Sequence, residues 1–168
     1  MAEIINADSM QVYRGMDIGT AKPTQDFLSH LPHHLIDVCA PNEQFGVGEF
    51  LPLADSLCKE IFLKRKLPVI CGGTAFYIRN FIYGLPKTPK ADLEIRQILH
   101  NRLKSEGIDQ LMQELTVLDP QRAKNIHIND EYRILRALEV CYSSGKSLSD
   151  FALDETPRSQ YDFLIIEL

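Results

Sequence analysis

A short apolar segment that runs into two glycines constrains the fold more than any other feature of the sequence. Residues 67–71, Leu-Pro-Val-Ile-Cys, have the composition of a buried strand, and Gly72-Gly73-Thr74 leads from them into a helix expected over about 75–83. A second apolar segment, Glu3–Asn6, also predicts a strand. Apolar residues recur at helical spacing over about 48–66, between the two strands. Strands that alternate with helices predict an α/β fold built on a parallel sheet.

Three expectations in the same part of the sequence and at its end depend on weaker signals. Leu35–Val38 is a second candidate strand. The helix over 48–66 accommodates Pro52 only if this proline lies in its first turn. Tyr161–Leu168 returns to strand composition. A core strand at that position is unusual, because no following residue covers it or pairs with it.

The middle of the chain carries helical patterns with no strand signal between them. Apolar residues recur at helical spacing over Leu93–Leu103 and again over Ile108–Leu115. A third helix is expected to carry Tyr132–Tyr142, with Asn129 or Asp130 as its N-cap. This pattern is typical of a helical insert beside a sheet.

The Pro- and Lys-rich stretch 85–90 is the best candidate for a linker between these two regions. We therefore expect residues 1–88 and 145–168 to form the α/β core, and 89–144 to form the helical insert with its flanking helix. Residues 87–136 carry nine basic and eight acidic side chains, a net charge of +1, although the whole chain sums to −5. The least acidic part of the chain therefore coincides with the expected insert.

The composition excludes several classes of protein. With 168 residues, 45% of them hydrophobic and 24% charged, the chain resembles an ordinary globular protein rather than a disordered or collagen-like one. No apolar run reaches the roughly 18 residues of a membrane span, and the first residues lack the pattern of a signal peptide. The four cysteines form no C-x-x-C pair and have no zinc-type spacing to histidine. We expect reduced, mostly buried thiols, no metal site and a cytoplasmic protein.

A carboxylate, Asp8, follows the first expected strand, and ligands bind at the carboxyl ends of parallel strands. Near it in the sequence are the polar side chains of Ser9 and Gln11, the cations Arg14 and Lys22, and two glycines. These residues predict a ligand site with Asp8 as its reactive group. The alternative is that Asp8 merely caps a helix that begins at Ser9 or the next residue.

The two glycines before Thr74 would expose backbone N–H groups at the start of a helix, where anions bind. The Thr74 hydroxyl could contact a phosphate or a base, and the alternative is a tight turn in which it caps the helix. Arg133 and Arg136 lie three residues apart on one expected helix, beside Tyr132. Such a set can hold a phosphate and stack a base. The alternative is a solvated face on which Arg136 pairs with Glu139 or Asp130.

Four ordered blocks of this sequence resemble the tRNA dimethylallyltransferase (tRNA isopentenyltransferase) family. They are Asn6–Pro23, with the sequence NADSMQVYRGMDIGTAKP, then His33–Asp37, Gly72–Thr74 and Arg136–Val140. The resemblance covers essentially all of residues 2–168. It implies a P-loop-kinase-like α/β core with a helical insert that grips a tRNA anticodon stem-loop. It also implies transfer of the dimethylallyl group from dimethylallyl diphosphate, accompanied by Mg²⁺, to N6 of the adenosine 3′ of the anticodon by a monomer.

The resemblance also implies roles for particular residues. Asp8 matches the family's general base, and Thr74 matches a second catalytic position. The positions that match the family's tRNA contacts are Asp8, Ser9, Met10, Gln11, Thr74, Arg96, Tyr132, Arg133 and Arg136. At two positions the sequence departs from the family pattern, because Tyr132 stands where many bacterial members have glutamine and Glu131 where they often have proline.

The loop that binds the diphosphate in this family, G-x-x-x-x-G-K-[ST], has no counterpart in these 168 residues. The family's C-terminal part, with an arginine that meets the diphosphate, has none either. We therefore expect an internal piece of a longer transferase that does not turn over alone. Two alternatives remain open. One is an isopentenyltransferase that acts on free adenine nucleotides, as in cytokinin synthesis, and the other is a non-catalytic RNA-binding fragment.

Overall fold

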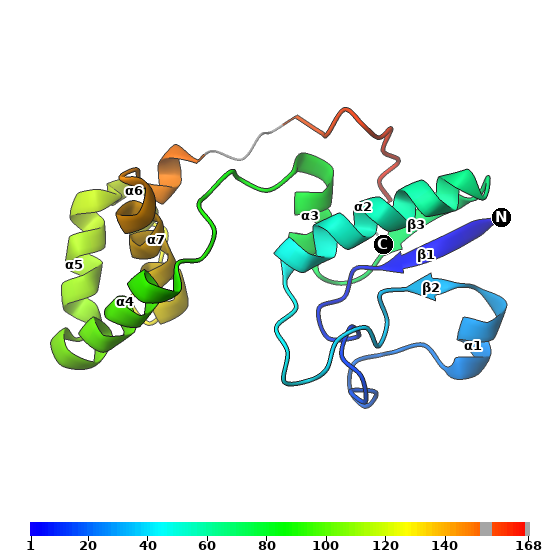
Figure 1. Cartoon of the computed structure of the whole chain (residues 1–168), viewed down its shortest axis with the longest axis horizontal. Coiled ribbons are helices and arrows are strands. Elements are labelled where there is room, and N and C mark those ends of the chain that lie inside the picture. Colours follow the sequence, from blue (N-terminus) through cyan, green and yellow to red (C-terminus); the bar gives the residue numbers. More distant parts are fainter. Residues whose placement is uncertain (152–155, 167–168) are drawn as a thin grey trace. The chain divides into compact units, whose positions relative to one another are not determined.

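The structure of the chain, a computed structural model, describes residues 1–151 and 156–166. It divides into two compact units, which Figure 1 shows as a sheet with helices and a separate group of helices. Unit 1 comprises Met1–Leu85 and Glu155–Leu168, and unit 2 comprises Pro86–Asp154. The sheet and the expected site around Asp8 therefore belong to unit 1, and the helical region belongs to unit 2.

Unit 1 is an α/β unit with a parallel sheet, so the predicted fold class is confirmed. Its elements are β1 (Ala2–Asn6), α1 (Gln25–His30), β2 (His33–His34), α2 (Val47–Leu63), β3 (Leu67–Cys71) and α3 (Ala75–Tyr83). The strand order is β2-β1-β3, and both neighbours pair with β1 in parallel. The register places Asn6 opposite Cys71, so β1 and β3 end at the same edge of the sheet.

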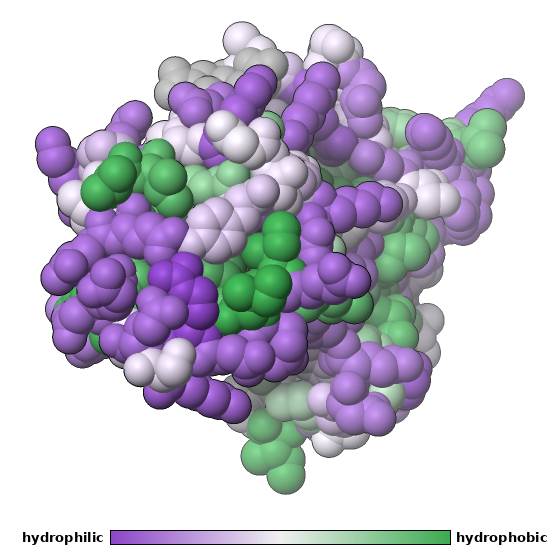
Figure 2. Space-filling view, turned by 60° about the vertical axis from the view of Figure 1, so that its left-hand side comes forward, coloured by the Kyte–Doolittle hydropathy of each residue, from purple (hydrophilic) through white to green (hydrophobic). Residues whose placement is uncertain are grey.

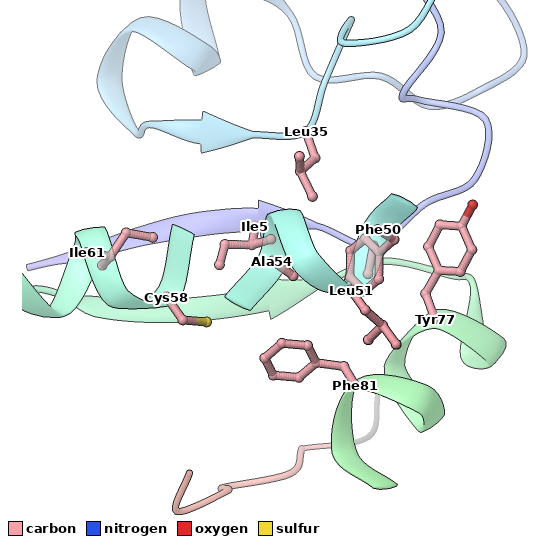
Figure 3. Close-up of a cluster of buried hydrophobic side chains, with 10 residues drawn as sticks. Ile5, Leu35, Phe50, Leu51, Ala54, Cys58, Ile61, Tyr77 and Phe81 are labelled. Carbon is pink, nitrogen blue, oxygen red and sulfur yellow. The ribbon is translucent and has the colours of Figure 1, made fainter. Parts of the chain in front are cut away.

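Helix α2 packs its apolar face against the sheet and supplies half of the buried residues in the core of unit 1. Phe50, Ala54, Cys58 and Ile61 follow one another at intervals of three or four residues and are at most 2% exposed. Figure 3 shows these side chains between α2 and the two long strands, close to Ile5 of β1. Full burial of each large apolar side chain stabilises the fold by about 1.5–3 kcal/mol.

The second candidate strand was predicted at the wrong residues. Strand β2 consists of His33–His34, and Leu35–Val38 follows it as bends and irregular backbone. Leu35 and Asp37 have φ angles of 63° and 56°, in the left-handed region. A strand cannot pass through residues in this conformation, so the apolar composition did not determine the backbone here.

The position expected for Pro52 was also wrong, because it is the sixth residue of α2 and lies beyond the first turn. A proline at this point removes one hydrogen bond to the carbonyl four residues earlier, at Gly48. Both Pro52 and Gly48 are exposed, so water can satisfy that carbonyl. The helix ends at Leu63, slightly before the expected boundary, and Arg65 follows it with a φ of 55°.

Residues 161–166 form no strand, contrary to expectation, and residues 167–168 lie outside the described part of the chain. Tyr161 and Phe163 pack their rings against Phe81 of α3, at centroid distances of 5.3 and 6.1 Å. Leu164, Ile165 and Ile166 are 63% or more exposed. Strand composition produces a strand only where a neighbouring strand offers a ladder of hydrogen bonds, and these residues pair with none of the strands described here.

Unit 2 is helical in its described residues. Its elements are α4 (Leu93–Glu106), α5 (Ile108–Leu118), α6 (Pro120–Ala123), α7 (Glu131–Ser144) and a short 3-10 helix, η1 (Leu148–Asp150). Leu99, Leu111, Leu115 and Leu138 are at most 1% exposed and form its core. Of the two candidate caps for α7, Asp130 is the N-cap, and its carboxylate accepts from the Arg133 N–H.

The cysteines are all free thiols, and three of the four are buried as expected. The exception is Cys71, which is exposed at the end of β3. Within the described ranges, no helix combines the length and apolar character needed to cross a bilayer.

Candidate functional site

The Asp8 carboxylate is held by a tight turn directly after β1. Its Oδ1 accepts hydrogen bonds from the backbone N–H groups of Met10, at 2.8 Å, and Gln11, at 3.2 Å. No helix begins at Ser9 or Met10, so the alternative of a helix cap is wrong. The other oxygen, Oδ2, has no hydrogen-bond partner among the described residues and lies 3.8 Å from the position a methyl group at Gly73 would take. One oxygen of Asp8 is thus fixed and the other is available.

Backbone hydrogen bonds join the loop after β1 to the loop after β3. The Ala7 N–H donates to the Cys71 carbonyl at 2.8 Å, and the Thr74 N–H donates to the Ala7 carbonyl at 3.1 Å. The approach is so close that a Cβ on Gly72 would lie 2.3 Å from the Ala7 carbonyl carbon. Gly72 is therefore required for this contact, which brings the two expected clusters, around Asp8 and around Thr74, to the same edge of the sheet.

The Thr74 hydroxyl lies between these two loops. It accepts from the Ser9 backbone N–H at 2.9 Å and donates to Ser9 Oγ at 3.2 Å. Thr74 occupies the N-cap position of α3, but its side chain makes no capping hydrogen bond. The plain helix cap considered as an alternative is therefore absent, and the hydroxyl instead holds Ser9 beside Asp8.

The polar side chains of Gln11 and Lys22 contact the loop after β1, and Lys22 also contacts the segment after β2. Gln11 Nε2 donates to the carbonyls of Thr20, at 3.0 Å, and Ala21, at 3.2 Å. The Lys22 side chain is only 5% exposed, and its ammonium pairs with Asp17 and Asp37. Burial acts to lower the pKa of Lys22, but its hydrogen bonds to these carboxylates outweigh burial and raise the pKa above its usual value. Lys22 therefore remains charged in the folded chain.

Tyr77 is a neighbour of Asp8 that the sequence did not indicate. Its ring stacks on Phe50 at 4.7 Å, and its hydroxyl donates to the Phe45 carbonyl at 3.3 Å. Figure 3 shows this hydroxyl pointing away from the apolar cluster. Burial, together with the nearby Tyr13, Glu49 and Asp8, raises the pKa of Tyr77 to about 12. Tyr77 is therefore a neutral hydrogen-bond donor at physiological pH.

In unit 2, Arg96 and Arg136 converge on a buried carboxylate. Glu139 is 1% exposed. Its Oε2 accepts from Arg96 Nη2 at 3.1 Å, and its Oε1 lies 3.0 Å from Arg136 Nη1 and accepts from the Asp92 N–H at 2.8 Å. Arg136 Nη2 also donates to the Pro89 carbonyl at 2.9 Å. The pairing of Arg136 with Glu139, considered as an alternative, is present.

Tyr132 and Arg133 differ from these two arginines in their exposure. Tyr132 is 73% exposed, and the Arg133 side chain, 64% exposed, pairs with Asp130 at 3.2 Å. Both lie in the first turn of α7, and Tyr132 lines a shallow depression there. The other residues that line it are His127, Asn129, Asp130 and Glu131. Figure 2 shows a largely hydrophilic surface interrupted by separate apolar areas. Of the expected RNA-binding residues in unit 2, these two present the most free side-chain surface.

The structure thus groups the expected residues in two sets. Asp8, Ser9, Met10, Gln11 and Thr74 lie together at the carboxyl edge of the sheet in unit 1, and Arg96, Tyr132, Arg133 and Arg136 lie in unit 2. In the described residues, no group of three or more His, Cys, Asp or Glu side chains could hold a metal ion.

Comparison with known proteins identifies the family to which this chain belongs. The family model described as IPP transferase matches residues 11–168, which is nearly the whole chain. The chain belongs to the IPP transferase family. The match includes Gln11, Thr74 and the helical region that carries Arg133 and Arg136.

Curated relatives of this family member are tRNA dimethylallyltransferases. That of Geobacter sulfurreducens is 45% identical over 89% of this chain and 48% of its own length. That of Aquifex aeolicus is 44% identical over 95% of this chain and 52% of its own length. The chain therefore spans about half the length of the curated relatives it matches.

Solved structures similar to this chain give the same family assignment. A full-length tRNA isopentenylpyrophosphate transferase from Bacillus halodurans is 42% identical, with a TM-score of 0.51, over 86% of this chain and 48% of its own. A eukaryotic dimethylallyltransferase acting on tRNA is 28% identical, with a TM-score of 0.75, over 91% of this chain and 40% of its own.

Proposed function

We propose that this chain supplies the adenosine-accepting part of a tRNA dimethylallyltransferase. The enzyme would transfer the dimethylallyl group of dimethylallyl diphosphate to N6 of the adenosine 3′ of the anticodon. The observation that carries the proposal is the Asp8 carboxylate, which has one oxygen fixed by two backbone N–H groups and the other available at the carboxyl edge of the sheet. Ligands bind at this edge in open α/β folds.

Asp8 acts in this proposal as the general base. The exocyclic N6 of adenine is a weak nucleophile, because its lone pair is delocalised into the ring. As N6 attacks the allylic carbon, the N–C bond forms, the bond between that carbon and the diphosphate oxygen breaks, and the diphosphate leaves with the bonding electrons. The nitrogen becomes strongly acidic, and Asp8 takes one of its protons. The fixed Oδ1 orients the carboxylate so that Oδ2 can receive that proton.

The neighbours of Asp8 would hold the base. Ser9 is placed by the Thr74 hydroxyl, and Met10 is 45% exposed, so its thioether can contact a base that has left its stack. Gln11 uses its amide nitrogen within the loop, which leaves Oε1 as its acceptor for a ligand N–H. An acceptor suits the amino group of adenine.

The donor diphosphate needs cations and N–H donors as it leaves. We propose that Mg²⁺ accompanies it, since this ion is usually held by phosphate oxygens, water and only one or two carboxylates. In this proposal the diphosphate would bring the ion to the site. The bound ion would stabilise the charge on the leaving diphosphate. The turn before α3 exposes the backbone of Gly73 beside Asp8 Oδ2, where the donor could approach.

In unit 2, the exposed Tyr132 and Arg133 would contact the anticodon stem-loop directly. Arg96 and Arg136 are tied to Glu139, so we propose that they mainly fix the helices that present the RNA-binding surface. This division favours a tRNA substrate over a free adenine nucleotide, because a nucleotide held at Asp8 has no need of a second unit.

Competition for binding tests this proposal. The chain is expected to bind an anticodon stem-loop RNA, and a large excess of AMP should displace it only weakly. Displacement by AMP at concentrations near its own Kd would support the nucleotide-modifying alternative. RNA binding that is unaffected by Asp8→Ala is expected under the proposal and under the non-catalytic alternative, so only a transfer assay separates these two.

A further inference from the structure

A buried lysine in unit 1 has all of its hydrogen-bond donors occupied, two by its own loop and one by the segment that follows β2. Lys22 Nζ lies 2.6 Å from Asp17 Oδ1 and 2.7 Å from Asp37 Oδ1, and it donates to the Tyr13 carbonyl at 2.9 Å. An ammonium group has three N–H donors, so none remains for a phosphate or a base. Although Lys22 follows the glycine-containing stretch after Asp8, it cannot be a ligand of the diphosphate in this arrangement.

The segment that Lys22 holds is the one that orients Gln11. The Gln11 amide donates to the carbonyls of Thr20 and Ala21, the two residues that precede Lys22. The Gln11 carbonyl accepts from the Asp37 N–H at 3.2 Å. The bonds from Lys22 to Asp17 and Asp37 therefore hold the two segments that contact the side chain and the backbone of Gln11. Gln11 lies three residues after Asp8.

The backbone is strained on both sides of these contacts, in the loop before Lys22 and in the segment after β2. Ala21 and Asp37 have φ angles of 53° and 56°, and Leu35, near Asp37, has a φ of 63°. Residues with a Cβ rarely adopt this conformation, and they keep it only where their surroundings hold them there. Ala21 is held through its carbonyl by Gln11, and Asp37 through its carboxylate by Lys22.

We propose that Lys22 is a positioning residue that locks the Gln11 amide and thereby sets the selectivity of the acceptor site for a base with an exocyclic amine. Lys22 itself touches no substrate. With its nitrogen engaged by Thr20 and Ala21, the Gln11 amide can offer only its oxygen, which accepts from an amino group and repels a carbonyl oxygen at the same place. If the amide were free to rotate, it could offer N–H donors as well, and the selectivity would fall. This inference rests on the proposed function, which places the adenine beside Asp8 and Gln11.

The first measurement needs no ligand. In the 168-residue chain, Lys22→Met should accelerate the exchange of the Gln11 side-chain amide protons with water by about tenfold, since it removes hydrogen bonds to charged groups. The backbone amides of Ile5 and Ile70, in β1 and β3, serve as the control for an intact sheet. Lys59→Met, at an exposed lysine of α2, is the matched variant and should leave Gln11 unchanged.

Asp17→Asn provides a second variant in case Lys22→Met does not fold. The Asp17 side chain is 67% exposed, so this change leaves the core intact, and it weakens one of the two carboxylate contacts of Lys22. Exchange of the Gln11 amide should rise by about threefold. Unchanged Gln11 exchange in a folded Lys22→Met or Asp17→Asn variant overturns the proposal.

The second measurement compares two stem-loop RNAs, one with adenosine 3′ of the anticodon and one with purine riboside, which lacks the amine. The unaltered chain should prefer adenosine by about tenfold, the value of one well-formed hydrogen bond. Lys22→Met should reduce this preference to about twofold or less, with Lys59→Met unaffected. A Lys22→Met chain that loses affinity for both RNAs equally, or keeps its preference, contradicts the positioning role.

The two measurements separate the two levels of the inference. If the unaltered chain shows no preference for adenosine, or binds neither RNA, the proposed function fails. The exchange of the Gln11 amide then still decides whether Lys22 locks it.

Discussion

The Thr74 hydroxyl accepts a hydrogen bond from the Ser9 backbone N–H at 2.9 Å and donates one to the Ser9 hydroxyl at 3.2 Å. This pair joins the loops that follow β1 and β3, because the two parallel strands end in register. It also explains how two weak sequence signals, 65 residues apart, form one site beside Asp8.

Replacement of Thr74 by valine should therefore destabilise unit 1 by about 1–2 kcal/mol, because it leaves the partly buried Ser9 N–H without its partner. Thr74→Ser keeps the hydroxyl and should stay within about 0.5 kcal/mol of the unaltered chain. Urea denaturation measures both. Equal stability of the valine and serine variants would show that the hydroxyl does not join the loops.

Gly72 and Gly73 offer a matched pair of alanine substitutions. A Cβ on Gly72 would lie 2.3 Å from the Ala7 carbonyl carbon, whereas a Cβ on Gly73 would lie 3.8 Å from Asp8 Oδ2. We expect Gly72→Ala to cost about 3 kcal/mol or more and Gly73→Ala less than about 1 kcal/mol. Thermal unfolding of both variants checks the order, and a Gly72→Ala chain as stable as Gly73→Ala would contradict the close approach of the loops.

The stability of unit 1 should depend on pH through Glu3. Hydrogen bonds from Lys66 and from His34 hold the pKa of this 3% exposed carboxyl at about 2, below its ordinary 4.5, although burial alone would raise it. Because the folded pKa is depressed, Glu3 stabilises the fold fully above pH 4.5, and this contribution is lost as the pH falls toward 2.

Glu3→Gln should accordingly lower the denaturation midpoint at pH 7, and the difference from the unaltered chain should shrink between pH 4.5 and 2. Urea titrations at several pH values measure it. A difference that stays constant over this range would mean that the Glu3 charge contributes nothing.

The arginines of unit 2 should separate into two kinds. Arg136→Met removes a partner of the buried Glu139 and should destabilise the chain by roughly 1–2 kcal/mol. Arg133→Met, at an exposed pair with Asp130, should change stability by less than about 0.5 kcal/mol. Arg133→Met should nevertheless weaken stem-loop binding, lower the slope of log affinity against log salt by about one, and have little effect at high salt. Filter binding at several salt concentrations measures these effects. Unchanged binding of the Arg133→Met variant would show that Arg133 does not contact the RNA.

Much of the fold could be predicted because it depends on local pattern. The apolar segments at Glu3–Asn6 and Leu67–Cys71 and the glycine turn before α3 each indicate their structure within a few residues. The register of parallel strands then brings Asp8 and Thr74 together without further information.

Other features depend on contacts between distant residues. Leu35 and Asp37 have left-handed conformations and make tertiary hydrogen bonds, with Asn6 and Lys22 respectively. No local pattern indicates these bonds, so the apolar composition of this segment wrongly predicts a strand. The spacing of three residues offers Glu139 as a partner of Arg136, but no local pattern indicates that Arg136 also donates to the Pro89 carbonyl. Likewise, no local pattern indicates that the Tyr77 ring stacks on Phe50.

The central claim is that Asp8 takes the proton from N6 during transfer. The direct test places the matched residues of this chain in the Geobacter sulfurreducens relative, in place of the 48% of that protein to which they align. Transfer from dimethylallyl diphosphate to an unmodified tRNA is then measured in the presence of Mg²⁺. We predict that the chimaera transfers the group and that Asp8→Asn lowers the rate by about 10²–10⁴ while tRNA affinity changes little. Transfer by the Asp8→Asn chimaera at the unaltered rate would contradict the account.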